Sequence, residues 1–155
     1  MRRSKSKKKI LLPDPKFKDT LATKFVNNLM IGGKKSVAFR IFYNALDLVE
    51  EKTKENGLEL WKKGLENVTP SVEVKSRRVG GATFQIPQEV KPNRKISLGM
   101  KWMIKYARER NANSMEQKLA DEIIAASKME GGAHKKKEDT RKMAEANKAF
   151  SHFRF

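Results

Sequence analysis

Cysteine is absent from this 155-residue chain, and its absence removes several classes of chemistry at once. Disulfides, thiolate nucleophiles and thiolate metal ligands are all excluded. The only histidines are His134 and His152, which belong to no HExxH or HxxxH pattern and which we expect in a mobile C-terminal part. We therefore predict no catalytic residues, no cofactor site, no protein-built metal site and no enzymatic activity.

Long apolar runs are missing as well. No stretch approaches the roughly 20 apolar residues that a membrane-spanning helix needs. The start, Met1-Arg2-Arg3-Ser4-Lys5, is basic but has no apolar run behind it, so we expect neither a secretory signal nor a transit peptide. Hydrophobic residues make up 38% of the chain, which favours one compact core with polar extensions.

Positive charge is what the chain has in excess. It contains 35 Lys and Arg against 18 Asp and Glu, a formal net charge of +17. Such an excess is typical of proteins that bind nucleic acid or anionic membranes. Basic residues without matching acids are concentrated in residues 1–18 and 75–110, whereas a merely solvated surface would intersperse both signs. These two segments are the first candidates for a binding surface.

Hydrophobic periodicity predicts a mainly α fold, a helical bundle of about six helices with one protruding β-hairpin and a flexible basic N-terminal arm. We divide the chain into the arm, residues 1–18, and a single helical RNA-binding domain, residues 19–155, with the hairpin at about 72–87 and a basic C-terminal helix and tail at about 134–155. Helices are expected from an N-cap at Asp19, over 34–56, 58–65 and 92–110, from a cap at Ser114, and over 139–149.

Glycines and apolar spacing fix further details of these helices. For the helix over 34–56 the predicted core residues are Val37, Ile41, Ala45, Leu48 and Val49. Gly57 is predicted to stop that helix, and Gly131-Gly132 to break the chain before the last one. In the helix over 92–110 the predicted core residues are Ile96, Met100, Met103, Ile104 and Ala107, with Trp102 and Tyr106 also packed inward.

The hairpin is the most specific local feature. Two β-type runs flank Gly80-Gly81, and both turn positions can take positive φ there without cost. A two-residue loop places Arg77 opposite Phe84 and Lys75 opposite Ile86. Cations beside an aromatic ring on a slender ribbon suit phosphates and stacked bases. The alternative is an ordinary surface hairpin with solvated charges.

Two further basic features accompany the hairpin. Arg94, Lys101, Lys105 and Arg108 fall within a narrow arc of one helix, which favours RNA contact over a merely wet helix face. Gly32-Gly33-Lys34-Lys35 fails the phosphate-loop pattern, but backbone N–H groups and two lysines at a helix N-terminus can hold one RNA phosphate.

Several strings in the chain resemble the universal ribosomal small-subunit protein seven family in its bacterial form, over nearly the whole length. They are Asp19-x-Leu21, Phe25-Val26, Gly33-Lys34-Lys35, Ile41-Phe42, Ala45, the hairpin string from Val72 to Ala82, and the string from Met143 to Phe150. The resemblance implies a cytoplasmic structural constituent of the small ribosomal subunit. It also implies a primary binder of the 3′ major domain of the rRNA that nucleates head assembly, near exit-site tRNA and the mRNA exit channel.

The resemblance, applied to each matching position, and the basic patterns together predict which residues contact rRNA and which lie near tRNA or mRNA. The residues expected to meet rRNA are Arg2, Arg3, Lys5, Lys7, Lys8, Lys9, Lys34, Lys35, Lys75, Arg77, Arg78, Arg94, Lys95, Lys101, Lys105 and Arg108. The residues expected near tRNA or mRNA are Arg78, Val79, Gly80, Gly81, Ala82, Arg141, Lys142 and Lys148. The implied neighbours are the small-subunit proteins numbered nine, eleven, thirteen and nineteen. No membrane, no homo-oligomer and no Mg²⁺ other than RNA-bound ions are expected.

Composition alone leaves three other classes open. A DNA-binding or nucleoid protein would bind duplex DNA as well as structured rRNA at equal salt. An enzyme acting on RNA would cleave or modify labelled RNA. A membrane-surface peptide is the weakest alternative, because the basic helix also carries a core-facing stripe.

Overall fold

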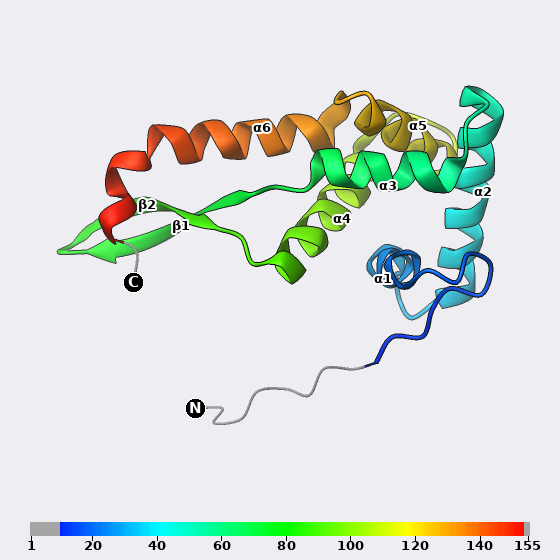
Figure 1. Cartoon of the computed structure of the whole chain (residues 1–155), viewed down its shortest axis with the longest axis horizontal. Coiled ribbons are helices and arrows are strands. Elements are labelled where there is room, and N and C mark those ends of the chain that lie inside the picture. Colours follow the sequence, from blue (N-terminus) through cyan, green and yellow to red (C-terminus); the bar gives the residue numbers. More distant parts are fainter. Residues whose placement is uncertain (1–9, 154–155) are drawn as a thin grey trace.

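Six α-helices and one antiparallel hairpin make up residues 10–153, the part of the chain that the computed structural model describes (Figure 1). The elements are α1 (Thr20–Leu29), α2 (Lys35–Thr53), α3 (Gly57–Val68), β1 (Val72–Val79), β2 (Ala82–Glu89), α4 (Pro92–Glu109), α5 (Met115–Ser127), α6 (Gly131–Ala146) and a 3₁₀ helix, η1 (Lys148–Phe153). The predicted mainly helical fold with one hairpin is therefore confirmed. Residues 1–9 of the predicted arm lie outside the described residues.

Side-chain caps begin several of these helices. The Asp19 carboxylate accepts a hydrogen bond from the Leu21 N–H at 2.8 Å, and Ser114 accepts one from the Gln117 N–H at 3.2 Å. Both predicted helix starts are confirmed. Partial burial by itself raises the pKa of Asp19, but hydrogen bonds from Lys62 and from the Leu21 N–H outweigh it and hold the pKa below its ordinary value.

Three aromatic rings occupy the centre of the core. Trp61 of α3 lies between Phe25 of α1 and Phe42 of α2, and each pair of ring centroids among the three is 5.3 Å apart. All three side chains are fully buried, so they anchor α1, α2 and α3 together. The predicted core residues of α4 are buried except Ile96, which packs against the core from its edge, as Trp102 and Tyr106 also do.

The buried face of α2 differs from the predicted one. Val37 is 37% exposed, and Ile41 and Leu48 are only partly buried. The deep residues are instead Ala38, Phe42, Ala45, Leu46 and Val49. The prediction is confirmed for Ala45 and Val49 and wrong for Val37, Ile41 and Leu48, because two neighbouring apolar stripes overlap on this helix. The stripe that contains Phe42 faces inward because α1, α3 and α5 all pack against it.

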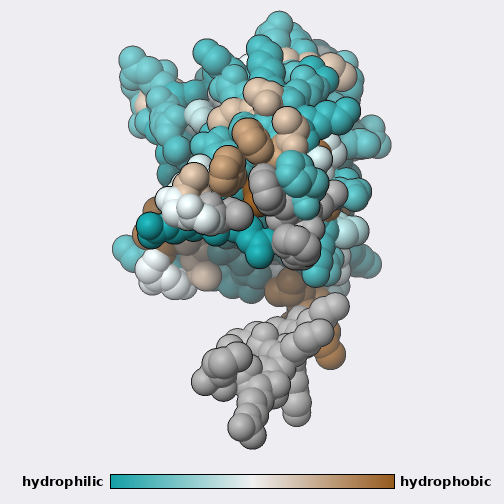
Figure 2. Space-filling view, turned by 90° about the vertical axis from the view of Figure 1, so that its left-hand side faces the viewer, coloured by the Kyte–Doolittle hydropathy of each residue, from teal (hydrophilic) through white to brown (hydrophobic). Residues whose placement is uncertain are grey.

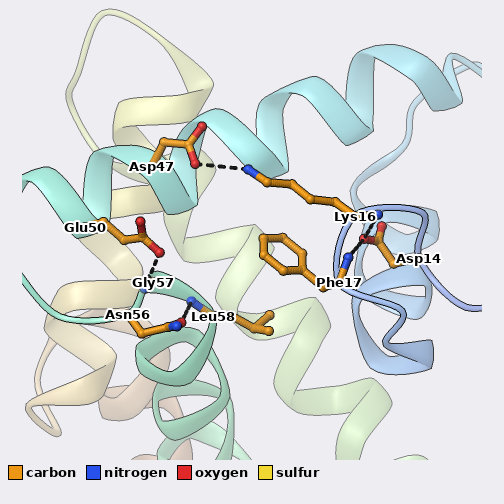
Figure 3. Close-up of polar contacts among 8 residues, drawn as sticks. All are labelled: Asp14, Lys16, Phe17, Asp47, Glu50, Asn56, Gly57 and Leu58. Carbon is orange, nitrogen blue, oxygen red and sulfur yellow. Dashed lines mark hydrogen bonds and ion pairs between the residues drawn. The ribbon is translucent and has the colours of Figure 1, made fainter.

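Gly57 does not stop α2, which is a second correction. Lys54, with φ of +62°, takes the left-handed conformation that ends the helix. Gly57 is instead the first residue of α3, where its N–H donates to Oε1 of Glu50 at 3.0 Å and Asn56 caps the same turn (Figure 3). A Cβ at this position would lie 2.6 Å from the carbonyl oxygen of Leu46, so the glycine allows α3 to start against α2.

Residues 14–18, which we had predicted to belong to the arm, are fixed on α2. The Asp14 carboxylate is buried and accepts hydrogen bonds from the N–H groups of Lys16 and Phe17 (Figure 3) and from the hydroxyl of Tyr43 at 2.8 Å. Burial and the contact with Asp14 raise the pKa of Tyr43 to about 12. The chain thus packs on the bundle already before the first helix.

The last helix starts eight residues earlier than predicted, at Gly131 instead of residue 139. Gly131-Gly132 does not break the chain. A Cβ on Gly132 would lie 2.5 Å from the ring of Tyr106, and Gly131 has φ of +87°, so both glycines let α6 begin directly against α4. His134 therefore lies on a packed helix and not, as expected, in a mobile segment; His152 lies in η1.

The hairpin projects from one end of the bundle and does not stand alone (Figure 1). Its two strands pair from Val72–Glu89 to Val79–Ala82, two residues beyond the predicted end at 87. Helix α6 runs alongside it, packing against both strands, and η1 packs against β2. Ile86, 2% exposed, is buried by this packing outside the main core.

Candidate nucleic-acid interface

The turn of the hairpin presents two arginines on opposite faces. Gly80 and Gly81 have φ of +57° and +92°, as a two-residue turn requires. The register pairs Arg77 with Phe84 and Lys75 with Ile86, which confirms the predicted alignment. Arg78 pairs with Thr83 one residue along, so its side chain points to the other face. Both arginines are exposed and lie next to the turn of the hairpin, which projects away from the helical bundle (Figure 1).

Phe84 has a structural role that the sequence did not predict. Its ring packs against Phe150 of η1, with the centroids 5.1 Å apart and the planes inclined at 48°. The side chain is half-buried. Phe84 therefore holds the hairpin against the C-terminal segment, while the arginines beside it remain exposed.

The base of the hairpin is fixed to α4 by a shared carboxylate. Glu73 accepts from Nε of Arg94 at 2.8 Å, lies 2.8 Å from the Nη2 atom of the same guanidinium, and lies 3.3 Å from Nζ of Lys75. Burial raises the pKa of Glu73, but hydrogen bonds from Arg94 and Lys75 outweigh burial and leave it below the ordinary value. Arg94 and Lys75 thus also have a structural role in addition to any contact with RNA.

The predicted basic stripe on α4 likewise contains residues that are simply exposed and residues that also make contacts within the fold. Lys101 and Lys105 are exposed, and Nζ of Lys105 lies 3.8 Å from Oε1 of Glu109, a solvent-exposed ion pair that contributes little to stability. Arg108 is exposed but donates a hydrogen bond to the carbonyl oxygen of Leu29 at 3.2 Å, across to α1. Lys95 is partly buried and lines a cavity with Leu21 and Lys62.

The start of α2 has the geometry of a phosphate contact. Gly32 and Gly33 both have positive φ, and no side chain caps the helix at Lys34. Lys34 and Lys35 are exposed there, and Nζ of Lys35 lies 5.6 Å from the centroid of the Phe39 ring. The N–H groups of Lys34 and Lys35 donate to the carbonyl oxygens of Ile31 and Gly33, so attraction for an anion rests on the positive end of the helix and on the two lysine side chains.

The hairpin and the C-terminal helix, predicted separately, come together. A groove of about 470 Å³ runs between them and is lined by Ser71, Val72, Pro87, Gln88, Arg141, Ala144, Glu145, Lys148 and Ser151. Arg141 is held by Glu138 and Glu145 at 3.0 and 3.5 Å, whereas Lys142 and Lys148 are exposed. Figure 2 looks at this end and shows a mostly hydrophilic surface with hydrophobic side chains near its centre and at its lower edge.

Four polar residues that the sequence reasoning missed line the groove between α1 and α4. They are Lys24, Asn27, Asn28 and Asn93. The available signal was the pair of adjacent asparagines inside α1, since asparagine is a poor helix former.

The described residues, 10–153, show no cluster of three or more His, Asp or Glu side chains able to hold a metal ion. Over the same range, no helix is both long enough and apolar enough to cross a bilayer.

Comparison with known proteins gives one consistent result. The family described as Ribosomal protein S7p/S5e matches residues 1–148. The chain is 66% identical over 155 residues to the small ribosomal subunit protein uS7 of Cytophaga hutchinsonii, and 62% identical over 158 aligned positions to that of Flavobacterium psychrophilum, with 100% of each chain covered. It is 59% identical to that of Teredinibacter turnerae over 148 residues, 96% of this chain and 95% of that protein.

Proposed function

Because the chain belongs to the ribosomal protein S7p/S5e family, we propose that it binds the 3′ major domain of the small-subunit rRNA and nucleates assembly of the head. It is a structural constituent of the small ribosomal subunit, in the cytoplasm, and not an enzyme. Association with rRNA and with other ribosomal proteins follows from that membership.

One observation supports the RNA-binding proposal above the others. The exposed cations Lys34, Lys35, Arg77, Arg78, Lys101 and Lys105 come from three separate places, the start of α2, the hairpin and α4. Cations spread over several elements suit a folded polyanion, whose counterions they displace on binding. We propose that the basic residues in 1–9 extend this surface.

The hairpin turn and the C-terminal helix supply the second part of the proposal. Residues 78–82, with Arg141, Lys142 and Lys148, form one end of the molecule, and we propose that this end lies near exit-site tRNA and the mRNA exit channel. The proposed neighbours are the small-subunit proteins numbered nine, eleven, thirteen and nineteen. Mg²⁺ is proposed only as ions on the RNA, and no second copy of the chain is required.

The test is charge reversal at the hairpin. The double variant Arg77→Glu/Arg78→Glu should bind a 3′-domain rRNA fragment at least tenfold more weakly and show a shallower salt dependence. The matched control, Lys63→Glu/Lys135→Glu, makes the same net charge change at two exposed helix positions away from the proposed surface. Unchanged affinity of the hairpin variant, with helicity intact, would remove the hairpin from the interface. Equal affinity of the native chain for duplex DNA of the same length, at the same salt, would favour the DNA-binding alternative over specific rRNA binding.

A further inference from the structure

Glu73 is an acid placed between two cations of the proposed RNA surface. Its Oε2 atom lies 2.8 Å from both Nε and Nη2 of Arg94, and its Oε1 atom lies 3.3 Å from Nζ of Lys75. The glutamate side chain is 13% exposed, whereas those of the two cations are each 55% exposed. The carboxylate therefore lies deeper than the two cations, which remain accessible to a ligand.

Arg94 occupies a position that its own helix disfavours. The first turn of α4, Pro92-Asn93-Arg94-Lys95, contains two cations and no acid. The positive end of a helix dipole favours acids and disfavours cations. Glu73 offsets this conflict from outside the helix, because it brings a carboxylate from β1 to Arg94. A local conflict that is compensated by a distant segment is typical of functional sites.

Both cations keep hydrogen-bond donors for a ligand while they contact Glu73. A guanidinium has five N–H donors, and the Nη1 atom of Arg94 has no hydrogen-bond partner among residues 10–153. Lys75 contacts the carboxylate through an ammonium group that has three donors. A phosphate group accepts several charge-assisted bonds of this kind, and a guanidinium held in one orientation loses less freedom in forming them.

We infer that Glu73 is a positioning residue for RNA binding, whose carboxylate holds Arg94 and Lys75 as a two-cation clamp for one phosphate group. The inference rests on the proposed rRNA binding and assigns a role to an acid that a count of charges would treat as unfavourable. Without Glu73, two flexible side chains would lose their rotamer freedom only on binding, and their like charges would repel. With Glu73, two cations and one acid still leave the clamp a net charge of +1.

The first experiment is decided by the sign of the effect. Glu73→Gln keeps the size of the side chain and one acceptor oxygen but removes its negative charge. If Glu73 only repelled phosphates, this variant would bind the 3′-domain rRNA fragment more tightly than the native chain. The inference predicts binding about fivefold weaker, because the two cations are no longer held in place.

The matched control for this experiment is Glu89→Gln, which removes an exposed acid at the same end of the hairpin. The control should bind no more weakly than the native chain. Circular dichroism verifies that both variants keep the fold. Affinity of Glu73→Gln equal to or above the native value would overturn the inference.

The second experiment separates positioning of the two cations from a general loosening of the hairpin. Ethylation of single phosphates in the RNA identifies the phosphates whose charge the chain needs for binding. Arg94→Ala should abolish the sensitivity at the phosphate held by the clamp. Glu73→Gln should abolish it at that same phosphate and leave the other sensitive positions unchanged, because only the clamp is disturbed.

Uniformly weaker binding of Glu73→Gln with the native pattern of sensitive phosphates would assign the effect to hairpin mobility and overturn the inference. If the native chain itself fails to bind the fragment, the proposed function fails. If the native chain binds and Glu73→Gln binds equally well, only the positioning role of Glu73 fails.

Discussion

Phe84 on the second strand of the hairpin and Phe150 in the C-terminal 3₁₀ helix pack ring against ring, with centroids 5.1 Å apart. An isolated two-stranded hairpin is only marginally stable in water. This one gains a packed face from α6 and η1, which belong to a part of the chain that starts more than 40 residues after the hairpin ends. The C-terminal segment therefore helps to fix the direction in which Arg77 and Arg78 point.

Replacing Phe150 by alanine should loosen the hairpin and leave the bundle intact. Loss of an aromatic pair of this kind costs about 1 kcal/mol, so amide hydrogens in residues 74–87 should exchange roughly fivefold faster. Hydrogen exchange read by NMR checks this, with the amides of α5 as the internal reference. Ser151→Ala, an exposed neighbour in η1, is the control. Unchanged protection in the hairpin would show that Phe150 does not support it.

A buried ion pair should be necessary for docking of α6. The side chain of Glu122 is 1% exposed. Its Oε2 atom accepts a hydrogen bond from Nε of Arg110 at 2.5 Å, and its Oε1 atom accepts one from the Ala133 N–H at 2.9 Å. Arg110→Ala leaves this carboxylate without its cation and should lower the free energy of unfolding by about 3 kcal/mol, at the low end for a buried pair because Arg110 is partly exposed. Urea unfolding measures the loss. Arg40→Ala, at an exposed position on α2, should change it by less than about 0.5 kcal/mol.

The attachment of the hairpin to α4 should weaken in acid. Because the pKa of Glu73 in the folded chain lies below its ordinary value of 4.5, its contribution to stability is fully present above pH 4.5 and disappears as pH falls through the lower folded value. NMR titration of the Glu73 carboxyl carbon should show a midpoint below 4.5. Arg94→Ala should raise that midpoint, because burial raises the pKa of Glu73 and the hydrogen bond from Arg94 that lowers it is then lost. Lys91→Ala should leave the midpoint unchanged. A Glu73 midpoint unaffected by loss of Arg94 would contradict the assigned cause.

Local signals were enough to predict several elements of the fold. Asp19 and Ser114 cap helices because their side chains can reach the first free N–H groups, and that reach depends only on nearby residues. Gly80-Gly81 selects a two-residue turn, which then determines the whole register from Arg77–Phe84 to Lys75–Ile86. The net positive charge of the chain depends on composition alone, so it could also be predicted without the structure.

Predictions failed where the local sequence allows two conformations or two buried faces and packing against a distant segment selects one of them. The helix over residues 35–53 has two adjacent apolar stripes, and only packing by α1, α3 and α5 selects the one with Phe42. Gly131-Gly132 has the composition of a chain break, yet the ring of Tyr106 requires glycine at the start of α6. Phe84 has the sequence environment of a surface aromatic residue, but its ring also packs against Phe150, 66 positions later in the chain.

The sequence by itself determined which segments are helical, where the hairpin turns, how much positive charge the chain carries and to which family it belongs, because these depend on near neighbours and on residue identity. Only the tertiary structure decided which cations are exposed and which, like Arg94, also fasten one element to another. It also decided that Asn27 and Asn93 border one groove although 66 positions separate them in the chain. The physical reason is that burial and juxtaposition depend on how whole elements pack, which no short stretch of sequence specifies.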